Sequence, residues 1–140
     1  MILSDFIAHA NDIADESESN RTITNFLNDA IAKVNAECSA NFPFMDYAIL
    51  DAEVPLPETW VRVILLPFAA GRIKTKDSSQ FEYSDLYAEF MTGLANFKAS
   101  YIIPDEFKDR SGMLYDPVTD TWYKPTSDVY TNRPYGWPGW

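Results

Sequence analysis

The sequence predicts an all-α fold, a four-helix bundle that carries a C-terminal extended arm with a small β-hairpin. Two observations predict this fold. Apolar residues recur at helical spacing in four segments of the first hundred residues, and polar or proline-marked stretches separate these segments. The last thirty residues hold three of the four tryptophans and four of the nine prolines, which leaves no run long enough for a helix. We expect a helical body over residues 1–107 and an arm over residues 108–140.

The first two helices are predicted from their caps and from the spacing of their apolar residues. Ser4 followed by Asp5 is typical of a helix N-terminus, so we expect a first helix near residues 5–16. Thr22 or Thr24 is the expected cap of the second helix. The apolar stripe of that second helix consists of Ile23, Phe26, Leu27, Ala30, Ile31, Val34 and Cys38. A one-sided stripe of this kind faces a core.

A connecting loop and a central helix follow. Several aromatic and aliphatic residues lie in the loop over residues 39–56, which predicts that it packs against the body. Pro57 is expected at the first position of the third helix, which is apolar on most sides and is therefore central. Pro67 lies inside this helix and should kink it, because proline removes one backbone donor. Arg62 and Arg72 either pair with carboxylates or extend to the surface.

The fourth predicted helix is long. The segment from Ser79 to Glu82 matches the Ser-x-x-Glu capping box. Six apolar or aromatic residues then follow at heptad spacing, which predicts one helix over residues 80–101. These residues are Tyr83, Tyr87, Phe90, Leu94, Phe97 and Tyr101.

The arm divides into two parts. Residues 113–115 and 121–123 are typical of strands, and the segment between them is typical of a turn, so a small β-hairpin is expected near residues 113–123. An isolated hairpin is marginal in water, so it should lie on the body or on a partner. Residues 124–140 are expected to form an extended strap, stiffened by three prolines.

The negative charge is concentrated in the body. The chain has a net charge of −10, and residues 1–103 carry fifteen Asp and Glu against seven Lys and Arg. A protein this acidic does not wrap DNA through phosphate contacts, which need Lys and Arg. It can line a passage that DNA crosses without sticking, because like charges repel. The plainer interpretation is that the charge keeps the protein in solution.

The sequence predicts no catalytic, metal or cofactor site. His9 is the only histidine and Cys38 the only cysteine, so neither a zinc site nor an intramolecular disulfide is expected. No glycine-rich phosphate loop is present, and the carboxylates follow no catalytic spacing. The N-terminus lacks the pattern of a signal peptide, and no run is long enough to span a membrane. We therefore expect a non-enzymatic protein that is made in a reducing cytoplasm.

The aromatic arm is the predicted partner-binding site. Its candidate anchors are Trp122, Tyr123, Tyr130, Tyr135, Trp137 and Trp140. Exposed Trp and Tyr side chains dock in grooves of neighbouring subunits, where they act as anchors. The arm could instead stack against sugar rings or fold back over its own body. Docking on another chain is the interpretation that an extended, proline-rich segment favours.

Two stretches of the body carry a resemblance to a known family. They are residues 26–31, FLNDAI, and residues 56–79, LPETWVRVILLPFAAGRIKTKDSS, which an aromatic, acidic helix follows. This pattern resembles the head–tail connector proteins of tailed bacteriophages, also called adaptor, head-completion or neck proteins. The resemblance covers about residues 1–107 and rests on packing patterns, and the segment beyond Phe107 extends past it.

The resemblance implies a structural virion protein at the head–tail interface. Such a protein assembles with neighbouring copies of itself into a ring, usually of twelve subunits, beneath the portal protein. The ring extends a channel through which DNA passes without sequence-specific binding, and it offers a docking surface to a downstream neck or tail protein. One alternative is a carbohydrate-binding or host-adsorption module of a virion that uses the aromatic tail. A second alternative is a small regulatory protein that mimics DNA through its acidity.

Overall fold

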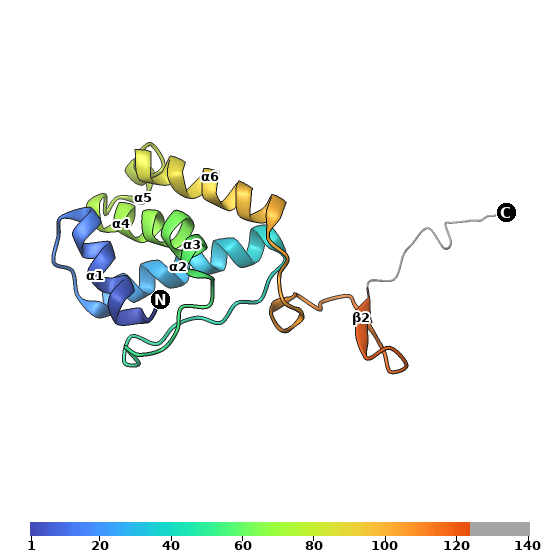
Figure 1. The fold of residues 1–140 in the computed structure, drawn as a ribbon. Coiled ribbons are helices and arrows are strands. Elements are labelled where there is room, and N and C mark those ends of the chain that lie inside the picture. The colour runs from blue at the N-terminus through green and yellow to red at the C-terminus, as the bar shows by residue number, and fades with distance from the viewer. Residues whose placement is uncertain (124–140) are drawn as a thin grey trace. The chain divides into compact units, whose positions relative to one another are not determined.

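The computed structural model describes residues 1–123, apart from the side chain of Ser78. The chain divides into two units, Met1–Lys108 and Asp109–Trp140. The first unit is built from helices, and the second contains a two-stranded antiparallel hairpin (Figure 1). The prediction of a mostly helical chain with a small hairpin near its C-terminus is therefore confirmed.

Helix α1 spans Leu3–Ala14 and begins earlier than the sequence predicts. Ser4 is inside the helix and does not cap it, so that prediction is wrong. The reason is a contact with a distant loop. The backbone N–H of Leu3 donates to the carbonyl of Ala52, and that of Ser4 donates to the carbonyl of Leu50, both at 2.9 Å. These carbonyls satisfy donors that a side-chain cap would otherwise serve.

Helix α2 spans Asn20–Cys38, and its cap is Ser19, whose hydroxyl accepts from the Thr22 N–H at 3.2 Å. The predicted caps Thr22 and Thr24 are wrong, because the helix starts before them. Thr24 is buried and donates its hydroxyl back to the Asn20 carbonyl at 2.7 Å. The predicted apolar stripe faces the core as expected. Its buried members are Ile23, Leu27, Ala30, Ile31 and Val34.

Three consecutive elements form one continuous central helix. They are α3 (Glu58–Trp60), the π-helix η1 (Val61–Leu65) and α4 (Leu66–Lys74). Pro57 is the N-cap residue of this helix rather than its first residue. The π-turn immediately precedes Pro67, whose ring supplies no N–H to the Val63 carbonyl four residues before it.

The central helix is buried on most sides. Helix α4 packs against α1, α2 and α6 (Figure 1). Its fully buried side chains include Phe68, which packs edge-on against Phe81 at 5.1 Å and against Phe90 at 4.9 Å between ring centroids. The central position that its composition predicts is what the structure shows.

The predicted fourth helix is two helices. Helix α5 spans Ser78–Phe81 and α6 spans Asp85–Ser100, so the helix predicted over 80–101 from a Ser79 cap is wrong in its first turn. Ser84 caps α6, since its hydroxyl accepts from the Tyr87 N–H at 3.2 Å and donates to the Phe81 carbonyl at 2.6 Å. Burial of the Phe81 ring against the central helix requires this break in the chain.

A short 3₁₀-helix, η2 (Asp105–Phe107), closes the first unit. The carbonyl of Phe107 accepts from the Asn41 N–H, and Ala40 and Lys108 form an isolated β-bridge. The Phe107 ring packs at a tilt against the buried ring of Phe42, with their centroids 4.9 Å apart. The end of the helical body is thus tied to the start of the loop that follows α2.

Candidate partner-binding site

The hairpin of the second unit carries the first candidate site. Strand β1 (Leu114–Asp116) pairs with β2 (Thr121–Tyr123) in antiparallel register, with Leu114 opposite Tyr123 and Tyr115 opposite Trp122. Opposite residues of an antiparallel pair lie on the same face, and neighbours along a strand lie on opposite faces. Tyr115 and Trp122 therefore share one face, with ring centroids 5.3 Å apart, and Leu114 and Tyr123 share the other.

Local hydrogen bonds fix the turn between the strands. The N–H of Val118 donates to the Asp116 carboxylate at 2.9 Å, and the hydroxyls of Thr119 and Thr121 lie 2.7 Å apart. Asp120 adopts a left-handed conformation with φ of 51°. An Asx-type turn followed by a left-handed Asp is typical of short hairpin loops.

A tyrosine–aspartate contact joins the turn to the first strand. The hydroxyl of Tyr115 donates to the Asp120 carboxylate. This side-chain hydrogen bond raises the pKa of Tyr115, because it stabilises the protonated phenol. Hydrogen bonds of Asp116 and Asp120 thus order the turn, and the ordered turn fixes the positions of the Tyr115 and Trp122 rings.

Both faces of the hairpin carry apolar side chains that are open to solvent. Trp122 is 40 % exposed, and Tyr115, Leu114 and Tyr123 are exposed to a similar degree. The Arg110 guanidinium lies over the Trp122 ring, 5.2 Å from its centroid. A two-stranded hairpin with one apolar face can rest on its own body, whereas two apolar faces need two covering surfaces.

The predicted anchors fall into two groups. Trp122 and Tyr123 lie on the described hairpin, and the structure places them on opposite faces. Tyr130, Tyr135, Trp137 and Trp140 lie outside the described residues. Sequence reasoning missed the cross-strand partners Tyr115 and Leu114 as members of the site. The alternation of strand positions, together with the turn length, would have found them.

The loop between α2 and α3 forms a second candidate surface. Two asparagines of α2 hold it through paired backbone hydrogen bonds. Asn35 accepts from the Phe42 N–H at 2.9 Å and donates to the Phe42 carbonyl at 3.0 Å. Asn28 does the same for Met45, at 2.8 and 3.0 Å. We call these contacts the asparagine clamps.

The clamped loop buries only part of its apolar surface. Phe42, Val54 and Leu56 are buried, as the prediction of a packed loop requires. The apolar residues between the clamps and Val54 are not: Phe44, Tyr47, Ile49 and Leu50 are between 38 % and 61 % exposed. The loop therefore packs against the body at its two ends, whereas its middle leaves large apolar side chains partly exposed.

The groove between α2 and α4 offers a concave surface of about 390 Å³. The small side chains Ala32 and Ala36 line it, together with Lys33 and Arg72. Arg72 packs over the Phe26 ring at 4.9 Å and lies 3.9 Å from the Asp29 carboxylate. Its buried Nε makes no hydrogen bond within the described part of the chain.

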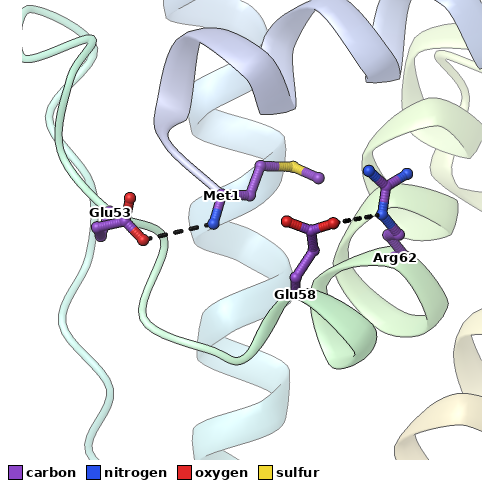
Figure 2. Close-up of polar contacts among 4 residues, drawn as sticks. All are labelled: Met1, Glu53, Glu58 and Arg62. Atoms are coloured by element: carbon purple, nitrogen blue, oxygen red, sulfur yellow. Dashed lines mark hydrogen bonds and ion pairs between the residues drawn. The ribbon is translucent and has the colours of Figure 1, made fainter.

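A wider groove of about 630 Å³ lies between the central helix and α6. Gly93 forms its floor, where a Cβ would lie 2.5 Å from the Val63 carbonyl oxygen. Trp60 and Arg62 line the opposite wall. Figure 2 shows two ion pairs, one between Arg62 Nε and the Glu58 carboxylate at 3.2 Å and one between the Met1 amino group and the Glu53 carboxylate at 3.4 Å.

The side chains that catalysis or metal binding would need are scattered. No group of three His, Cys, Asp or Glu side chains able to hold a metal ion occurs among residues 1–123. His9 is half-buried on α1. Burial raises the pKa of the Cys38 thiol, with Lys98 opposing the shift and Glu37 adding to it. A raised thiol pKa suppresses the thiolate that nucleophilic chemistry uses.

Comparisons with protein-family models, with curated proteins and with solved structures found no match. Among the described residues, no helix has both the length and the apolar character needed to cross a membrane.

Proposed function

We propose that this chain is a structural, non-enzymatic virion protein, a head–tail adaptor of a tailed bacteriophage. In this proposal the first unit is a four-helix bundle, and copies of the chain form a ring below the portal protein. The ring extends the DNA channel and offers the docking surface for a neck or tail protein. The resemblance of the body to connector proteins supports this assignment, and the concentration of negative charge there suits a passage for DNA.

The observation that carries the proposal is a hairpin that exposes large apolar side chains on both of its faces. Tyr115 and Trp122 on one face and Leu114 and Tyr123 on the other are all exposed within their unit. Exposed aromatic clusters of this kind mark binding sites for other proteins. An adaptor joins two different assemblies and therefore needs surfaces that bind other proteins.

Deletion of residues 111–140 tests the proposal. The truncated chain should keep the helical circular dichroism of the body and lose attachment to capsids that carry the portal. The single changes Trp122→Ala and Tyr123→Ala should each weaken attachment about thirtyfold or more, the effect of removing one aromatic anchor worth about 2 kcal/mol. Val118→Ala is the matched control, because Val118 is 90 % exposed at the turn and outside both faces. Normal attachment of the truncated chain would refute the proposal.

A carbohydrate-binding or host-adsorption module is the second candidate. The exposure of the Trp122 and Tyr123 rings favours it, since sugars stack on exposed aromatic faces. This candidate replaces the first one if the full chain binds glycans, if Trp122→Ala or Trp137→Ala abolishes that binding, and if neither change affects capsid attachment.

A further inference from the structure

The middle of the loop between α2 and α3 carries acidic and apolar side chains that the described residues leave largely open, with the Arg21 guanidinium over the Tyr47 ring at 5.6 Å. We call residues 44–51 the display loop. It exposes four large apolar side chains, of which Phe44 is the most open at 61 %. It also carries Asp46 and Asp51, and residues 41–56 contain no Lys or Arg. An exposed cluster of apolar residues rimmed by charge is typical of a protein-binding surface.

The display loop is held at both ends. Asn28 fixes Met45 at one end through two hydrogen bonds. At the other end the carbonyls of Leu50 and Ala52 accept from the first turn of α1. The carboxylate of Asp46 accepts from the Ala48 N–H at 3.0 Å and orders the turn between them. A segment that is already ordered loses little conformational freedom on binding, which favours association.

The groove between α2 and α4 has the complementary chemistry. Ala32 and Ala36 leave room there for an aromatic side chain, in a concavity of about 390 Å³. Lys33 and Arg72 supply two cations against one carboxylate, that of Asp29. An acidic, aromatic loop fits this groove better than a basic one does.

The display loop does not fill the groove of its own chain, because Phe44 is 61 % exposed there. Both surfaces involve α2, and successive residues of a helix are rotated by about 100°. Asn28 and Asn35 therefore lie within about 20° of each other around α2. Of the groove residues on α2, Ala32 points about 50° away from them, Ala36 about 90° and Lys33 about 150°. The asparagine clamps thus hold the loop beside the Ala32 edge of the groove, while the rest of the groove faces another side of α2.

We propose that the display loop of one copy occupies the α2–α4 groove of a second copy, with Phe44 seated between Ala32 and Ala36. The inference rests on the proposed function, in which copies of the chain form a ring, and it names the contact between neighbouring copies. Loop and groove are different surfaces, so the contact is heterologous and repeats from copy to copy until a ring closes.

Association of the full chain tests this contact. Sedimentation velocity between about 1 µM and 1 mM, the range of weak to moderate affinities, should show concentration-dependent assembly of the wild type. Phe44→Ser should weaken assembly at least about tenfold, since Phe44 is exposed and its loss leaves the core intact. Tyr83→Ser is the matched control, because Tyr83 is 90 % exposed and belongs to neither surface. A monomeric wild type, or equal assembly of Phe44→Ser, would overturn the inference.

A charge exchange tests that the two surfaces meet each other. Lys33→Glu and Asp51→Lys should each weaken assembly alone. Their equimolar mixture should assemble again, because every groove then faces a loop of opposite charge. Failure of the mixture to assemble overturns the inference. Assembly that depends on Trp122 and not on Phe44 overturns the loop–groove inference and leaves the adaptor proposal intact. Assembly that depends on Phe44, in a chain that does not attach to capsids, refutes only the adaptor proposal.

Discussion

Removing one asparagine clamp should release the loop residue that it holds, either Phe42 or Met45, and leave the other residue attached to α2. Asn35→Ala deletes two hydrogen bonds to the Phe42 backbone, and Asn28→Ala deletes two to Met45. Each such bond contributes about 0.5–1.5 kcal/mol net, so each variant loses about 1–3 kcal/mol. Alanine is a better helix former than asparagine by about 0.5 kcal/mol, which offsets part of the loss. The free energy of unfolding should therefore fall by about 0.5–2.5 kcal/mol.

Amide hydrogen exchange distinguishes the two clamps. Asn35→Ala should deprotect the Phe42 amide while the Met45 amide stays protected, and Asn28→Ala should do the reverse. Asn25→Ala is the matched control, since Asn25 lies on the same helix and is exposed. Urea denaturation of this control should show no loss of stability, because only the helix propensity changes. Equal stability of Asn35→Ala and Asn25→Ala, or an unchanged Phe42 exchange rate, would refute the assignment of the clamps.

Three further predictions concern single side chains. Gly93→Ala should lower the free energy of unfolding by about 1–3 kcal/mol in urea denaturation, because its Cβ would lie 2.5 Å from the Val63 carbonyl oxygen. Arg72→Met should leave that free energy equal or higher, since it removes an unpaired buried Nε and keeps an apolar side chain in place, whereas Arg72→Ala should lower it. Asp120→Asn should lower the pKa of Tyr115 in an ultraviolet titration, because the hydrogen bond to Asp120 raises it. The raised pKa means that this contact stabilises the hairpin at neutral pH and that the contribution is lost as pH rises through the titration of Tyr115.

Local patterns predicted those elements whose determinants lie close together in the sequence. The stripe of α2 from Ile23 to Val34 faces the core as its spacing requires. The hairpin was predictable because strand residues flank the turn around Pro117. Trp122 and Tyr123 lie on opposite faces of the hairpin because successive side chains of a β-strand alternate between its two faces.

Other features depend on contacts between distant residues, and the sequence alone does not reveal them. Ser79 matches a capping box but lies inside α5, whereas Ser84 caps α6 next to the buried Phe81 ring. The asparagine clamp at Asn28 joins residues seventeen positions apart, and nothing in the local pattern marks it. The loop over residues 39–56 was expected to pack against the body, and nothing in its sequence indicates that Phe44 is open to solvent.

The asparagine clamps also impose a matched length on two segments. Seven residues of α-helix, from Asn28 to Asn35, rise about 10.5 Å. Three residues of extended chain, from Phe42 to Met45, cover about 10 Å. The two spans run in opposite directions and agree closely, so one added or deleted residue at positions 43–44 would put at least one clamp out of register. Evolutionary or engineered changes in loop length should therefore be confined to the residues after Met45, which are not held between the two asparagine clamps.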